Sequence, residues 1–196
     1  MGQDAASIRH HCRNTNVVGN FVGTMKSLMD FLKIGDKIKE KWGRQFHKHV
    51  DFCGLEPVND PDYRYESTPV NSEVFATTGG DGVHFSLLNT NIGLDDKKVI
   101  IMTVPMIDKI IILADSFDEF LGLGYYNGWF PLEQLVYNFN DTIGYYSTPD
   151  NFLTLQQRNF LDFMKTEFDI VHSPLTKMRL EILERLYTDM LILNIK

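Results

Sequence analysis

The fold is decided by a stretch that reads SEVFATTGGDGVHFSLL from residue 72 to residue 88. Residues 72–78 and 83–88 are rich in β-branched and aromatic side chains, and the glycine-rich sequence GGDG separates them. Glycine adopts the backbone angles that a tight reversal requires, so this arrangement is typical of a β-hairpin. The stretch therefore predicts two adjacent antiparallel strands.

The next residues along the chain predict two more strands and a helix. Residues 98–104 and 109–113 flank a proline-containing break at 105–108. The sequence SFDE at 116–119 then matches a capping box, in which the Ser116 hydroxyl and the Glu119 carboxylate accept hydrogen bonds from backbone N–H groups. We expect the helix that follows to bury an apolar face made of Phe117, Phe120, Leu121 and Leu123.

Amphipathic patterns predict helices before this region. A helix is expected between Asn20 as its cap and Gly35 as its stop, with an apolar stripe of Phe21, Met25, Leu28, Met29 and Leu32. A second short helix is expected after Asp36, with Ile38 and Trp42 on its apolar side. Residues 54–70 contain three prolines and four acidic residues, which indicates a connecting segment without buried structure.

Two long helices are expected at the C-terminal end. Thr148-Pro149 and Ser173-Pro174 each offer a capping residue followed by proline, which is favoured at the first helical position. The two apolar stripes consist of Leu153, Phe160, Leu161, Met164 and Phe168, and of Leu175, Met178, Ile182, Leu183, Leu186, Met190 and Leu193. These stripes could close on each other, on the first helix or on a second copy of the chain, and the sequence leaves that choice open.

These elements predict an α+β fold. Its core is a mixed, mostly antiparallel sheet of about four or more strands with helices packed on one side, plus N-terminal and C-terminal helices. We expect a flexible N-terminus over residues 1–19, an α+β domain over 20–145, and a helical extension over 146–196 that packs on the domain or on a partner.

The charge is distributed unevenly along the chain. The net charge is −7, with nine Lys or Arg against four Asp or Glu in residues 1–50, but one against seven in residues 105–150. An acidic middle disfavours nucleic-acid binding, because phosphates are repelled by carboxylates. It suits a basic protein partner, and the alternative is a solvated acidic surface that only aids solubility.

No stretch of about 20 apolar residues is present, and the N-terminus lacks the apolar run of a signal peptide, so we expect a cytoplasmic protein without a membrane span. The two cysteines, Cys12 and Cys53, are then expected to be reduced thiols. Metal-binding side chains occur at His10, His11, Cys12, His47 and His49. Their spacing matches no zinc motif, so we expect neither a metal nor another cofactor.

One set of residues permits a catalytic alternative. Asp81, His84 and Ser86 lie in or beside the predicted hairpin and contain the side chains of a hydrolase triad. However, nothing places the serine on a nucleophile elbow, and the GGDG sequence lacks the pattern of a phosphate-binding loop. We therefore expect no catalytic residues and keep a small hydrolase as an alternative.

Three segments resemble a bacterial member of the SUKH superfamily: VFATTGGDGVHFS at 74–86, TVPM at 103–106 and SFDEFL at 116–121. The resemblance covers roughly residues 55–135 and rests mainly on the strand–strand–helix order. The superfamily unites immunity proteins of contact-dependent and polymorphic toxin systems with fungal regulators of cell-wall synthesis. The resemblance implies a mostly antiparallel sheet with helices on one side, no cofactor, and binding of a protein.

We therefore expect a non-catalytic protein-binding module, of the immunity type that binds and neutralises a toxin domain; a scaffold or regulatory protein is the alternative. Aromatic rings supply contact area and carboxylates supply complementarity to a basic partner. Both kinds of side chain gather around the predicted helix, so the expected partner-binding residues are Asp115, Asp118, Glu119, Tyr125, Tyr126 and Trp129. If the interface lies elsewhere, the acidic segment 56–66 is the best second position.

Overall fold

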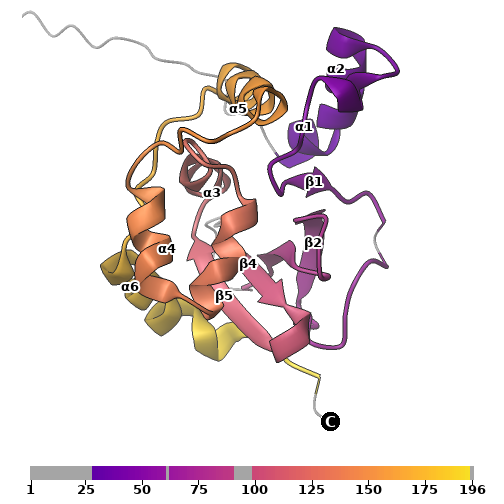
Figure 1. Ribbon diagram of the computed structural model, residues 1–196. Helices are drawn as coiled ribbons and strands as arrows, with labels where there is room; N and C mark the ends of the chain where they lie inside the picture. The colour runs from indigo at the N-terminus through magenta and orange to yellow at the C-terminus, as the bar shows by residue number, and fades with distance from the viewer. Residues whose placement is uncertain (1–27, 61, 91–98, 195–196) are drawn as a thin grey trace, which may run out of the picture.

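A computed structural model of the chain describes residues 28–60, 62–90 and 99–194. Its centre is a five-stranded antiparallel sheet with the order β1-β2-β3-β4-β5, so that each strand pairs with its neighbours in sequence (Figure 1). The strands are β1 Glu56–Pro57, β2 Ser72–Thr77, β3 His84–Leu88, β4 Val99–Val104 and β5 Lys109–Ala114. The predicted α+β class and its antiparallel sheet are confirmed.

The four predicted strands are present, and a fifth, β1, was not predicted. Glu56 and Pro57 pair with Thr77 and Ala76 of β2, within the segment that the sequence marked as connecting. Proline is tolerated there because β1 is an edge strand, where a missing N–H donor costs no ladder hydrogen bond. The preceding Leu55 is fully buried, so this part of the prediction for 54–70 was wrong.

Both faces of the sheet are covered. Side chains alternate between the two faces along a strand, and all six residues of β4 are buried. The first face carries Phe75, Phe85 and Met102 in the main core. The second face carries a smaller cluster around Ile101 and Ile112.

The first face is covered by α1 Leu28–Leu32, α2 Ile34–Trp42, α3 Phe117–Leu123 and α5 Leu155–Phe168. The buried residue of α1 is Phe31, whose ring lies edge-on to Phe75 with centroids 6.0 Å apart. Phe31 was not in the predicted stripe, whereas Met29, which was, is 61% exposed. The predicted stop was also wrong, because Gly35 lies inside α2; Asn20, Phe21 and Met25 lie outside the described residues.

The second face is covered by α6 Lys177–Tyr187, which lies along β5 (Figure 1). Leu183 and Tyr187 of α6 are buried in the smaller cluster. The structure thus answers the question that the sequence left open: α6 closes on the sheet, while Phe160 and Met164 of α5 are buried in the main core. The predicted α6 stripe was partly wrong, because Met178, Leu186 and Leu193 are exposed and Leu180 is buried instead.

Both C-terminal helices begin later than the predicted capping residues. Thr154 and Gln157 form a full capping box at the start of α5, and Thr176 caps α6. The predicted cap at Thr148 belongs to a loop instead, because the Asn127 side chain donates to the Thr148 carbonyl and accepts from the N–H of Asp150. A loop held in this way leaves the helix to begin at the next capping residue.

The chain between α3 and α5 forms a 3₁₀ helix, η3 Phe130–Val136, followed by α4 Phe139–Tyr146. Three single-turn 3₁₀ helices complete the described structure: η1 Phe46–Lys48, η2 Pro105–Ile107 and η4 Thr188–Met190. Within the described ranges, none of the helices has both the length and the apolar character that crossing a bilayer requires.

Candidate functional site

Two of the predicted contact residues, Asp115 and Glu119, form ion pairs inside the protein. Arg179 of α6 donates to Glu119 Oε1 at 2.7 Å and to Asp115 Oδ1 at 2.8 Å. The α3 cap is confirmed for Ser116, whose hydroxyl accepts from the N–H of Glu119, but the Glu119 carboxylate accepts from the N–H of Asp115, one residue earlier than a capping box requires. These two acids already pair with one arginine, which lies 60 or more residues away in sequence.

This arrangement sets the ionisation of Glu119. Burial alone would raise the pKa of its carboxyl group, but the hydrogen bonds from Arg179 and from the N–H of Asp115 outweigh burial and lower that pKa. The same contact with Glu119 raises the pKa of Arg179. Glu119 is therefore an internal anchor for α6.

Trp129 is a correction to the predicted interface. Its side chain is fully buried, and its indole Nε1 donates to the Phe120 carbonyl at 3.0 Å. A side chain at Gly124 would collide with the Trp129 ring, so the indole fills the space that this glycine leaves. Trp129 is a core residue and is not available to a partner.

Tyr125 and Tyr126 are half-buried and contact each other edge-on, with ring centroids 5.0 Å apart. Tyr126 also packs against His172 at 4.7 Å, and the Lys165 ammonium lies 4.6 Å above the Tyr125 ring. The tyrosine pair is thus occupied by the segment around α5. Asp118 is exposed at the start of α3.

The Asp81, His84 and Ser86 alternative is not brought together as a triad. His84 is buried, and its Nδ1 lies 2.8 Å from the Gly82 carbonyl, which can only accept, so Nδ1 carries the proton. Nε2 then accepts from the Thr68 hydroxyl at 3.0 Å. Both ring nitrogens are used within the fold, and burial lowers the pKa of His84.

The described residues contain no group of three or more metal-binding side chains. His10, His11 and Cys12 lie outside the described residues. Cys53 is a buried free thiol whose pKa is raised by burial and by the nearby charge of Asp51, so it stays protonated at neutral pH.

A different surface is built where the chain before β1 crosses the start of η3. The Cys53 carbonyl accepts from the N–H groups of both Trp129 and Phe130. This close approach requires glycine on both sides: a side chain at Gly54 would collide with the backbone of Phe130, and one at Gly128 would lie 2.5 Å from Cys53 Cβ. Both glycines also have positive φ, at 77° and 74°. The crossing leaves Phe130 48% exposed beside β1.

The β2–β3 turn lies against the same place. A side-chain carbon at Gly80 would lie 3.7 Å from the Phe130 ring, and one at Gly79 would lie 2.9 Å from the Glu56 carboxylate. Asp81, the next residue of the turn, is exposed and close enough to Glu133 of η3 to affect its ionisation. We call Glu56, Asp81, Phe130 and Glu133 the acidic face.

Within the acidic face, the negative charge of Asp81 acts on Glu133. Burial raises the pKa of the Glu133 carboxyl group, the negative charge of Asp81 raises it further, and a hydrogen bond from Gln134 lowers it in part. Within the described part of the chain, no ion pair involves Glu56, Asp81 or Glu133. Glu56 belongs to segment 56–66, the predicted second position for an interface, but nothing in the sequence linked this segment to Asp81 and Glu133.

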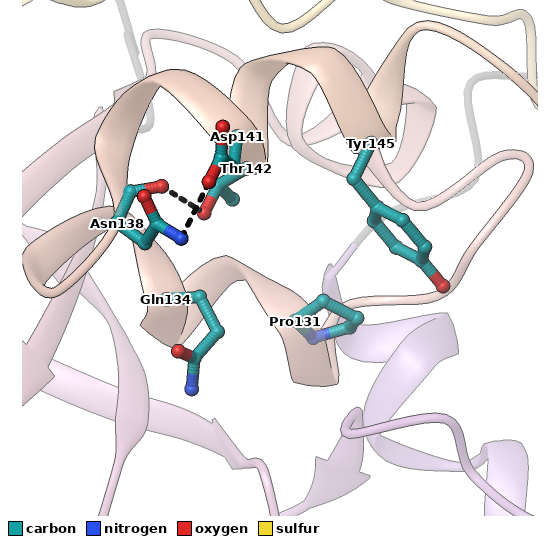
Figure 2. A pocket seen from close by; sticks show the side chains of 6 residues that line it. All are labelled: Pro131, Gln134, Asn138, Asp141, Thr142 and Tyr145. Carbon is teal, nitrogen blue, oxygen red and sulfur yellow. Dashed lines mark hydrogen bonds between the residues drawn. The ribbon is translucent and has the colours of Figure 1, made fainter.

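A groove of about 260 Å³ lies next to the acidic face, between η3 and α4 (Figure 2). It is lined by Pro131, Gln134, Asn138, Asp141, Thr142 and Tyr145. The Asn138 side-chain amide donates to one carboxylate oxygen of Asp141 at 2.7 Å, and the Thr142 hydroxyl donates to the main-chain carbonyl of Asn138. Figure 2 shows these polar groups on one side of the groove and Pro131 and the Tyr145 ring on another.

None of the family models, curated proteins and solved structures compared with the chain matches it. The resemblance to the SUKH superfamily therefore remains a prediction from residues 74–86, 103–106 and 116–121.

Proposed function

We propose that this protein is a non-catalytic binding module that engages a basic protein partner through the acidic face, and that it acts as an immunity-type protein that neutralises a toxin domain. The observation that carries the proposal is the acidic face itself. Three segments far apart in sequence contribute carboxylates around the exposed Phe130 ring, and no cation of the described residues pairs with these carboxylates.

The energetics of these groups favour a cationic partner. The negative charge of Asp81 makes ionisation of Glu133 more costly, and a lysine or arginine brought between the two carboxylates removes that cost. The partner gains apolar contact from Phe130, whose backbone is held in place by the hydrogen bond from its N–H to the Cys53 carbonyl. An acidic patch also steers a basic protein toward it over roughly 10 Å at 0.1 M salt.

Other features support binding over catalysis. The His84 ring, which a hydrolase would need as a base, donates to Gly82 and accepts from Thr68. The immunity role rests on the resemblance of the β2–β3 hairpin and α3 segments to the SUKH superfamily. A scaffold or regulatory protein would use the same surface for a partner that is not toxic.

Co-expression with the product of the adjacent gene tests this proposal. We expect that product to arrest growth when expressed alone, growth to be restored when this chain is present, and the two proteins to elute as one complex at low salt. A complex without toxicity would support the scaffold role instead. Absence of both complex and rescue would contradict the proposed function.

A further inference from the structure

The groove between η3 and α4 continues the acidic face. Gln134 lines the groove, and its side-chain amide also donates to the Glu133 carboxylate at 3.3 Å. From residue 110 to residue 157 the sequence contains no lysine or arginine. A partner that covers the acidic face would therefore also reach this groove. Residues 110–157 place no lysine or arginine beside the groove to repel a basic partner.

The polar side of the groove presents acceptors. Asp141 uses one carboxylate oxygen to accept from the Asn138 amide, and among the contacts of the described residues its other oxygen has no hydrogen-bond donor. The side-chain carbonyl of Asn138 is likewise without a donor in the described residues. These two oxygens lie on neighbouring side chains that a hydrogen bond holds together. They form a pair of exposed acceptors in the lining of the groove.

The apolar side of the groove is a flat wall. The Tyr145 hydroxyl donates to Asp150 at 2.7 Å, which holds the ring in position. Pro131, the second residue of η3, lies beside it in Figure 2. A flat aromatic wall next to a carboxylate matches a planar cation, which stacks on the ring and donates in the plane.

We propose that this groove receives an arginine side chain of the basic partner, with the guanidinium donating to Asp141 and Asn138 and stacking against Tyr145. Guanidinium presents several donors in one plane, whereas the ammonium of lysine is a compact point charge that gains little from a flat wall. A phosphate or carboxylate ligand is disfavoured by Asp141 and Glu133. This inference rests on the proposed function, because it names one side chain of that partner.

The test uses two small probes, N-acetyl-arginine methylamide and the neutral N-acetyl-citrulline methylamide, titrated into the isotope-labelled full chain and followed by NMR. We expect saturable shifts at residues 131–145 with the arginine compound and none with the citrulline compound. Asp141→Asn keeps an acceptor for the Asn138 amide but removes the charge. It should lower the affinity for the arginine compound about fivefold, the upper range for an exposed charge pair. Asp162→Asn, an exposed acid on α5, should change nothing.

A second pair of variants tests the wall. Tyr145→Phe removes the contact with Asp150 but keeps the ring, so it should retain most of the affinity, whereas Tyr145→Leu should lower it. Equal shifts with the citrulline compound, or equal affinity in Asp141→Asn, would overturn the arginine site. A complex with the adjacent gene product that Asp141→Asn leaves unchanged would also overturn it while leaving the proposed function standing. If the unaltered chain forms no complex with the adjacent gene product, that result would instead contradict the proposed function.

Discussion

Arg179 holds α6 to the start of α3 through Asp115 and Glu119, so replacing it should loosen the second face of the sheet. Arg179→Met keeps most of the side-chain volume and removes the charge. We expect it to lower the free energy of unfolding by about 1–3 kcal/mol, between the values for exposed and buried ion pairs, because two half-buried carboxylates lose their partner. Urea unfolding at neutral pH measures this.

The effect of Arg179→Met should depend on pH. The pKa of Glu119 is lowered in the folded protein, so the stabilisation is complete above the ordinary glutamate pKa of about 4.3 and is lost as pH falls through the lowered value. The matched control is Lys177→Met, which removes an exposed pair with Glu181. An equal loss of stability in both variants would contradict the anchoring role of Arg179.

His84 makes a second, separate contribution to pH dependence. Burial lowers the pKa of its imidazole, so folding resists its protonation. Stability is complete above the unfolded histidine pKa of about 6.5 and falls as pH drops below it toward the lowered folded value. The protein should therefore lose more unfolding free energy between pH 7.5 and pH 5 than His84→Gln does, as urea titrations at both values would show. Equal losses would mean that His84 does not couple to folding.

Single residues were the part of the site least accessible to sequence analysis. Trp129 follows an Asn-Gly pair, and this sequence context is typical of an exposed aromatic contact residue. In the structure, however, its ring fills the space beside Gly124 and is fully buried. The pairing of Glu119 with Arg179 joins residues 60 positions apart, and no local pattern predicts such a pair. Tertiary contacts determine both the burial of Trp129 and the pairing of Glu119 with Arg179.

Strands were predicted well because their signals are local. The β2–β3 hairpin and β4 follow from short β-branched and aromatic runs with turn residues between them, and the structure places each within about two residues of its predicted bounds. Helix starts were predicted less well at Thr148 and Ser173. Asn127 captures the first of these segments as a loop, which is a contact that sequence cannot show.

The burial of α6 is testable at the level of this element. Leu183 is fully buried on the second face, whereas Leu186, three residues later, is 49% exposed. Leu183→Ala should lower the free energy of unfolding by about 2–5 kcal/mol, because it leaves a cavity against the sheet. Leu186→Ala should stay within about 0.5 kcal/mol of the unaltered protein. Denaturant unfolding of the two variants compares them directly, and similar losses would contradict the packing of α6 on the sheet.

The acidic face exists only in the assembled molecule. Composition showed that the middle of the chain is acidic, and Glu56 lay in the segment that the sequence named as a second position. The meeting of β1, the β2–β3 turn and η3 around Phe130 depends on the crossing at Gly54 and Gly128, which no motif signals. Charge was predictable from the sequence, but its arrangement was not.

The rate of association with the adjacent gene product tests the central claim most directly. The double variant Asp81→Asn/Glu133→Gln removes two charges from the acidic face, and Asp162→Asn/Glu184→Gln removes two exposed charges from α5 and α6. Measured by stopped flow at low salt, the first should associate about three- to tenfold more slowly with a weaker salt dependence, because steering depends on the local field. The second should associate at nearly the unaltered rate. Equal rates for the two double variants would contradict the claim that the acidic face binds the partner.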